Sequence, residues 1–160
     1  MTQQPPRDVG EDELRDWLAL LHVPGLGPAG FGELLERFAS PRAVLEDAGS
    51  GLSGELARHL RNPAWEAVDA DLAWVDAPDK HIVTLHDPRY PALLRQIADP
   101  PPVLFVHGEP ATLCDHLLAV VGSRNPSAGG SRTAFEFARH LAGAGLVITS
   151  GLALGVDGAA

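Results

Sequence analysis

Residues 117–127 read Leu-Leu-Ala-Val-Val-Gly-Ser-Arg-Asn-Pro-Ser, and residues 146–157 read Leu-Val-Ile-Thr-Ser-Gly-Leu-Ala-Leu-Gly-Val-Asp. Each stretch begins with an apolar run that is typical of a buried strand and then passes into small residues. The sequence between them, up to Ala144, has the character of a helix. This order of strand, glycine-rich loop, helix, strand and second glycine-rich loop predicts the beginning of a parallel α/β sheet.

The two glycine-rich loops, the first loop (residues 122–127) and the second loop (residues 150–155), are candidate phosphate-binding sites. At such loops free backbone N–H groups and the positive end of a helix dipole face the same point. Arg124 follows the first glycine, where a guanidinium can donate two hydrogen bonds to a phosphate or stack on a base. The alternative is that the glycines only permit tight turns. The predicted phosphate-binding residues are Gly122, Ser123, Arg124, Ser127, Ser150, Gly151 and Gly155.

These stretches resemble the DNA processing protein A family, also called DprA or Smf. The family's first loop has the pattern V-G-S-R-x-x-S-x-Y-G and its second loop the pattern S-G-L-A-x-G-I-D. Residues 87–94 and 99–108 also resemble the segments that precede the first loop in the family. Two positions depart from it, because Gly129 replaces the usual tyrosine and Leu154 replaces a residue that is often basic.

The resemblance implies a single-stranded DNA-binding protein of natural transformation, which protects incoming DNA and helps to load RecA recombinase. It implies no catalysis, no cofactor and a homodimer when the protein is full length. It also implies that the chain is an N-terminal portion, since the family pattern continues past Ala160 into further strands. The contact surface for RecA is then expected beyond residue 160.

The first half of the chain has a helical period. Prolines and glycines cut the segment into four or five short helices. Three apolar helix faces follow from the spacing: Leu14, Trp17, Leu18 and Leu21; Phe31, Leu34, Leu35 and Phe38; and Trp65, Val68, Leu72 and Val75. Short β-type runs begin near His81. We therefore expect an all-α domain over residues 1–76, which resembles the family's SAM-like helical domain. Residues 77–160 are expected to form the first, incomplete part of a Rossmann-like DNA-binding domain.

A second phosphate-binding candidate lies between two of these predicted helices. Residues 23–27 read Val-Pro-Gly-Leu-Gly, which resembles a helix-hairpin-helix turn. In DNA-binding versions of this turn, the backbone amides hold a phosphate. A close corner between two packed helices is the favoured interpretation, because Glu33 and Glu36 follow and no lysine occurs before Lys80.

The charge balance argues against a broad DNA-binding surface. The 160 residues include 12 Lys and Arg against 21 Asp and Glu, which gives a net charge of −9. The excess is uneven, since residues 1–76 hold six basic and 14 acidic side chains, and residues 77–160 hold six and seven. A local phosphate site in the second half therefore remains compatible with the composition.

One basic helix face is a weaker candidate. Arg132 and Arg139 lie seven residues apart on the predicted helix after the first loop, hence on one face. The favoured interpretation is a solvated surface paired with Glu136. Arg132 lies nearer the first loop and is the candidate for a secondary DNA contact.

Several other functions are disfavoured by the residues themselves. The single cysteine, Cys114, excludes an internal disulfide, and no apolar run approaches the ~20 residues of a membrane span. A cytoplasmic protein with no membrane contact is expected. The seven histidines show neither a pair spaced i, i+4 nor a C-x-x-C partner, so no metal site is predicted. No G-x-S-x-G elbow presents a serine as nucleophile.

Two alternatives from other classes remain open. One is a nucleotide-binding or phosphoribohydrolase-type enzyme on a Rossmann-like fold, although the P-G-G-x-G-T segment of such enzymes is absent. The other is a helical protein-interaction module in which the α/β half has no active part. The first of these would bind mononucleotides, whereas the second would act through residues 1–76 alone.

Overall fold

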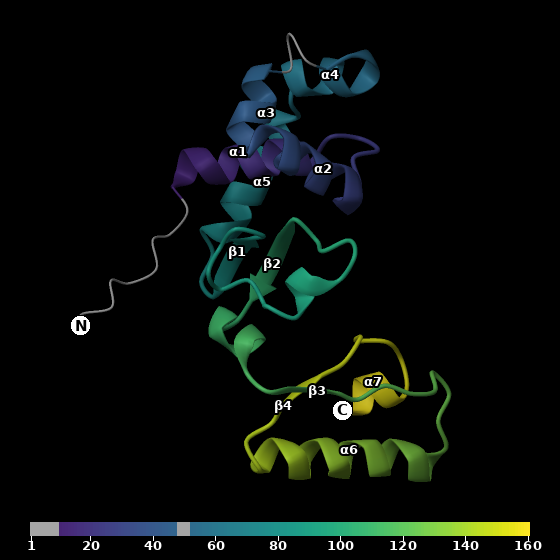
Figure 1. Ribbon diagram of the computed structural model, residues 1–160. Helices are drawn as coiled ribbons and strands as arrows, with labels where there is room; N and C mark the ends of the chain where they lie inside the picture. The colour runs from purple at the N-terminus through teal and green to yellow at the C-terminus, as the bar shows by residue number, and fades with distance from the viewer. Residues whose placement is uncertain (1–9, 48–51) are drawn as a thin grey trace, which may run out of the picture. The chain divides into compact units, whose positions relative to one another are not determined.

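The computed structural model describes residues 10–47 and 52–160 of the chain (Figure 1). The chain divides between Pro110 and Ala111 into two compact units, which we call the helical unit and the α/β unit. Each unit has its own packing and is described by itself.

The helical unit begins with five helices in the part of the chain that the structure describes. Proline or glycine is the first residue of three of them. Proline suits this position because the N–H that it lacks would have no partner in the first turn of a helix. The predicted series of four or five short helices is thereby confirmed. The helices are α1 (Glu11–Leu21), α2 (Pro28–Phe38), α3 (Pro41–Asp47), α4 (Gly54–Arg61) and α5 (Trp65–Val75).

The helices pack around one apolar core. Trp17 of α1 is fully buried and stacks on Phe31 of α2, with the ring centroids 5.4 Å apart. Burying each large apolar side chain stabilises the fold by roughly 1.5–3 kcal/mol. The helix faces read from the sequence form this core, except that Trp65 of α5 is exposed. Their other members in or against this core are Leu14, Leu18, Leu21, Leu34, Leu35, Phe38, Val68, Leu72 and Val75.

A two-stranded antiparallel ribbon completes the helical unit. Strand β1 (Lys80–Thr84) pairs with β2 (Val103–His107) along their whole length. Ile82 and Val103 lie in the same core as the helices. The change from helices to strands falls near residue 77, as the sequence suggests, whereas the compact units divide only after residue 110.

The segment between β1 and β2 is fixed by buried polar groups. The carboxylate of Asp87, 1% exposed as a residue, accepts hydrogen bonds from the backbone N–H of Arg89 at 2.8 Å and from its guanidinium at 2.7 Å. The Tyr90 hydroxyl donates to the carbonyl of Pro101 at 2.8 Å. A short 3₁₀ helix, η1 (Leu94–Gln96), follows.

The α/β unit contains the strand–helix–strand arrangement predicted from the sequence. A 3₁₀ helix, η2 (Pro110–Cys114), leads into β3 (Leu117–Ala119), which is followed by α6 (Ala128–Gly143), β4 (Val147–Thr149) and α7 (Val156–Ala159). β3 and β4 are parallel, and α6 packs on β4 (Figure 1). Both strands are shorter than the apolar runs that contain them.

No helix within residues 10–47 and 52–160 is long and apolar enough to cross a membrane.

Candidate phosphate-binding loops

The first and second loops come together at one edge of the β3–β4 sheet. Parallel strands end at the same edge, so the loops that follow them are neighbours. The N–H of Val156 donates to the carbonyl of Ser123 at 3.0 Å, which joins the end of the second loop to the first. The Ser150 hydroxyl donates to the carbonyl of Val120 at 2.9 Å. The structure therefore brings together the residues that the sequence assigned to one site.

Two glycines allow this close approach. A Cβ at Gly122 would lie 2.8 Å from the side chain of Val156. Gly155 has φ +91°, and a Cβ there would overlap the carbonyl oxygen of Ser123 and lie 2.7 Å from that of Arg124. Packing between the loops is thus sufficient reason for glycine at both positions, and their predicted contact with phosphate remains a prediction.

Asp157 fixes the second loop. Its carboxylate accepts the backbone N–H of Gly151 at 3.1 Å, and its carbonyl oxygen lies 3.4 Å from the hydroxyl of Ser150. The Ser150 hydroxyl and the Gly151 N–H are therefore engaged within the protein. Ser150 and Gly151 were predicted to bind phosphate. In the structure they stabilise the second loop through hydrogen bonds within the protein.

The serines of the first loop also form local hydrogen bonds. Ser127 is the N-cap of α6, where its Oγ accepts the backbone N–H of Gly130 at 3.1 Å. Capping is a common role of serine at a helix N-terminus, and the phosphate contact predicted for Ser127 remains a prediction. The Oγ of Ser123 accepts the N–H of Asn125 at 3.1 Å. Each hydroxyl still has its own proton to donate.

Free backbone donors remain at the first loop. Among the described residues, the N–H groups of Gly122, Ser123 and Arg124 have no hydrogen-bond partner, and all three residues are exposed. The first two N–H groups of α6, those of Ala128 and Gly129, are likewise without a partner in that part of the chain. Groups of this kind, at the start of a 16-residue helix, favour an anion.

The arginines of the α/β unit are exposed and unpaired. Within the described ranges, Arg124, Arg132 and Arg139 take part in no ion pair or side-chain hydrogen bond. The pairing of Glu136 with Arg132 or Arg139 that the sequence suggested is therefore not formed. Arg15, Arg42, Arg58 and Arg89 of the helical unit, by contrast, each pair with a carboxylate.

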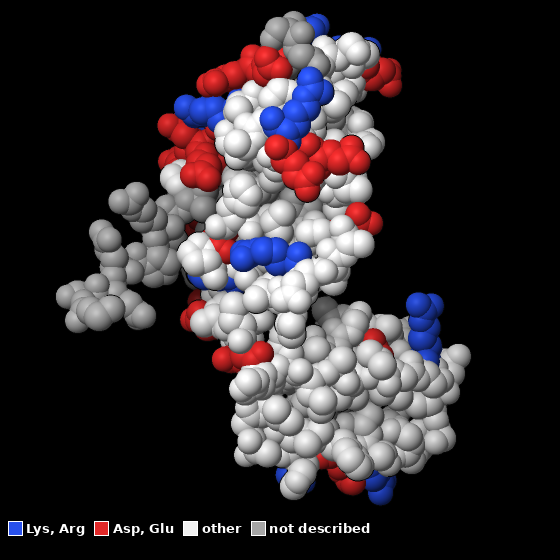
Figure 2. Space-filling view, viewed as in Figure 1, with Lys and Arg blue, Asp and Glu red and all other residues white. Residues whose placement is uncertain are grey.

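The helix-hairpin-helix candidate connects α1 to α2. Its Gly25 has φ +78°, and the N–H of Leu26 donates to the carbonyl of Val23 at 3.1 Å. These features make a tight corner, as the favoured interpretation requires. Acidic side chains gather on the helical unit (Figure 2), which opposes the approach of a phosphate backbone.

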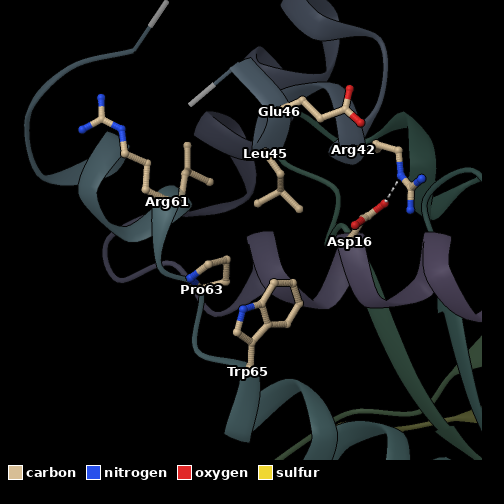
Figure 3. Close-up of a pocket in the computed structure, with 8 residues that line it drawn as sticks. Asp16, Arg42, Leu45, Glu46, Arg61, Pro63 and Trp65 are labelled. Carbon is tan, nitrogen blue, oxygen red and sulfur yellow. Dashed lines mark hydrogen bonds and ion pairs between the residues drawn. The ribbon is translucent and has the colours of Figure 1, made fainter. Parts of the chain in front are cut away.

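The helical unit also contains a pocket of about 580 Å³ (Figure 3). Arg42 enters it but donates to the carboxylate of Asp16 at 3.0 Å. This hydrogen bond and the charge of Asp16 raise the pKa of Arg42. Trp65, which the sequence placed on an apolar helix face, is 42% exposed at the pocket wall. Because Arg42 is paired with Asp16 and Glu46 adds a second carboxylate to the lining, the pocket does not suit a phosphate.

Within the part of the chain that the structure describes, no group of three His, Cys, Asp or Glu side chains is placed to hold a metal ion.

Comparison with known proteins agrees with the loop motifs. The model of the family described as DNA recombination-mediator protein A matches residues 81–160. Protein Smf of Escherichia coli is 35% identical over 152 residues, which cover 90% of this chain and 39% of that protein. DNA processing protein DprA of Bacillus subtilis is 38% identical over 77 residues, which cover 48% of this chain and 26% of that protein.

A solved structure gives the same result. The X-ray structure of DNA processing protein A (DprA) from Streptococcus pneumoniae matches with a TM-score of 0.67 and 27% sequence identity. The match covers 91% of this chain and 51% of that one. The chain thus spans about half or less of the length of these relatives.

Proposed function

Because the chain belongs to the family of DNA recombination-mediator protein A, which includes the Smf and DprA proteins, we propose that it binds single-stranded DNA without catalysis. The binding site comprises the first loop, the second loop and Arg124. In a full-length protein this activity protects incoming DNA in the cytoplasm during natural transformation and helps to load RecA recombinase. RecA and a second subunit of the full-length dimer are the proposed protein partners.

The same proposal assigns the domains. Residues 1–76 form a SAM-like helical domain, and residues 77–160 contribute the beginning of a Rossmann-like DNA-binding domain. The first strands after residue 77, β1 and β2, pack into the core of the helices, so the compact unit extends to Pro110. Open α/β sheets bind ligands at the carboxyl ends of their strands, which is where the two loops lie. The parallel pairing of β3 with β4 supports this assignment.

One observation carries the proposal. The exposed, unpaired Arg124 stands in the first loop beside backbone N–H groups that have no partner in the described residues. A guanidinium and N–H donors together suit phosphate oxygens and leave the bases unread. Binding is therefore independent of sequence. Arg132, on the first turns of α6, is the proposed secondary contact.

The test is the replacement Arg124→Ala, measured by fluorescence anisotropy on labelled single strands. We expect binding to weaken by about 1.5–3 kcal/mol, the range for hydrogen bonds to a charged group, equally on mixed and homopolymeric strands. Arg58→Ala is the matched control, because Arg58 is an exposed arginine of the helical unit. Affinities of Arg124→Ala and wild type that agree within about twofold would remove Arg124 from the site.

Salt dependence gives a second measure of the same site. For single strands, log K falls by about 0.7 per tenfold rise in salt for each phosphate neutralised. Since Arg124 and Arg132 are the only proposed cationic ligands, the slope should be shallow. A steep slope would contradict this assignment and favour a more extended basic surface.

A further inference from the structure

A groove on the helical unit has an apolar floor and an acidic rim, and we call it the acidic groove. One wall is α2, which contributes Glu33 and Glu36, and the other wall is the segment around Asp99. The groove has a volume of about 570 Å³. Its apolar floor is formed by Phe31, Leu35, Leu85, Ile97, Pro100 and Pro102.

The charges of the acidic groove are unbalanced. Among the described residues, Glu33, Glu36 and Asp99 have no ion pair or hydrogen bond through their side chains. The one arginine that lines the groove, Arg95, donates to the carbonyl of Asp87 at 3.1 Å and lies over a tyrosine ring. Three carboxylates around an apolar floor attract a partner that is both basic and apolar, and they repel a phosphate backbone.

The α/β unit presents a surface of that chemistry. Ala134 and Ala138 form the buried face of α6. Arg132, Glu136 and Arg139 lie on its outer side, and Phe135 lies on the flank beside the two arginines. Phe135 is 55% exposed between the two arginines. The arginines are seven residues apart, about 10 Å along the helix. In Figure 2 both basic and acidic atoms lie over α6, on its side away from β3 and β4.

We propose that the acidic groove of one molecule binds the outer face of α6 of a second copy of this chain. Phe135 enters the apolar floor, and Arg132 and Arg139 approach the carboxylates of the rim. Charge complementarity favours this occupant, because the α6 face carries two unpaired arginines against the one carboxylate of Glu136 and has an exposed aromatic side chain beside them. The contact shares Arg132 with the proposed DNA-binding site, so its test measures self-association in the absence of DNA.

Charge reversal tests the contact in the intact chain. One variant carries Glu33→Arg and Glu36→Arg, and the other carries Arg132→Glu and Arg139→Glu. All four positions are exposed, so the substitutions leave the folded units intact, which circular dichroism checks. Sedimentation velocity measures self-association of each protein from about 1 µM to about 500 µM.

We expect the wild-type chain to self-associate and each variant alone to lose at least about tenfold in association constant, because like charges then face each other. An equimolar mixture of the two variants should associate again, since each groove then meets an α6 of opposite charge. A wild-type monomer across the range would overturn the proposal. Self-association that both variants retain, or a mixture that stays dissociated, would also overturn it.

The aromatic anchor has a matched control on the same helix. Phe135→Ala should weaken self-association by about tenfold or more, whereas Phe137→Ala should have little effect. Phe137 is 63% exposed but lies on the other flank of α6. Equal effects of the two replacements would show general apolar adhesion and would refute the assignment of Phe135 to the groove.

Discussion

Replacement of Gly155 by alanine should detach the two loops from each other. Gly155 has φ +91° and ψ −126°, a backbone conformation that is nearly restricted to glycine. A methyl group there would overlap the carbonyl oxygen of Ser123 and lie 2.7 Å from that of Arg124. Relief of this overlap requires the loops to move apart, which breaks the 3.0 Å hydrogen bond between Val156 and Ser123.

The magnitude follows from these two effects. An alanine held in the glycine conformation costs roughly 1–3 kcal/mol, and the lost hydrogen bond costs roughly 0.5–1.5 kcal/mol. We therefore expect the α/β unit to lose about 2–4 kcal/mol of stability. Affinity for single strands should fall as well, since Arg124 and its neighbouring N–H groups then lose their fixed position.

Hydrogen exchange is the suitable measurement, because it resolves the two units. Peptides from residues 146–160 should exchange between about 30-fold and about 1,000-fold faster in Gly155→Ala, as the expected loss of stability requires. All three tryptophans, at positions 17, 65 and 74, belong to the helical unit. The urea midpoint of tryptophan fluorescence should therefore stay unchanged.

Gly129→Ala is the matched control. Gly129 is the second residue of α6, and a Cβ there would meet only the Ser127 Oγ, at 3.9 Å. Alanine is favoured over glycine in a helix by up to about 1 kcal/mol, so this variant should exchange at the wild-type rate or more slowly. The reasoning fails if Gly155→Ala exchanges within about threefold of wild type over residues 146–160.

Three further outcomes are expected. Ser127→Ala removes the N-cap of α6 and should destabilise the α/β unit by about 1 kcal/mol, measured by the same exchange, whereas unchanged protection would contradict the cap. Burial raises the pKa of Tyr90 above its ordinary value, and Arg95 partly opposes this. The protonated Tyr90 hydroxyl therefore stabilises the folded state fully below about pH 10, and this contribution is lost as pH rises through the folded-state pKa. Between about pH 9 and pH 11 the urea midpoint of wild type should accordingly fall further than that of Tyr90→Phe. Limited proteolysis should leave a core that ends near Pro110, and a core that ends near Ala77 would instead support the domain boundary read from the sequence.

The sequence was sufficient for the elements whose pattern is local. Trp17 and Phe31 repeat with their neighbours at helical spacing, and this spacing predicted the core of the helical unit. The parallel pair followed from two apolar runs separated by one helix. The ends of those runs were misleading, because apolarity continues through Val121 although β3 ends at Ala119.

Contacts between distant segments were beyond such reasoning. The ring of His86 lies edge-on to Trp17, with centroids 5.0 Å apart, a contact that no local pattern around His86 predicts. The acidic groove was missed because its two walls are far apart in the chain. The sequence feature that indicates it is the pair Glu33 and Glu36, which are three residues apart and therefore lie on one face of α2.

For the candidate site, the sequence predicted which residues gather at the two loops but not how they are engaged. The order of strand, loop and helix predicted that the two loops meet. It gave no means to see that Gly155 packs on Ser123, or that Asp157 occupies the N–H of Gly151. The packing of Gly155 on Ser123 depends on how closely the two loops approach each other, and the sequence of either loop alone does not determine that distance.

The uneven distribution of charge has a kinetic consequence. Residues 111–160 hold three arginines against Asp115, Glu136 and Asp157, so the whole net charge of −9 belongs to residues 1–110. Repulsion between this part and a DNA strand extends over about 10 Å at 0.1 M salt. For the proposed DNA-binding site, we therefore expect productive collisions only when a strand approaches the α/β unit. Added salt relaxes the repulsion, so the association rate constant should rise with ionic strength while the bound state dissociates faster.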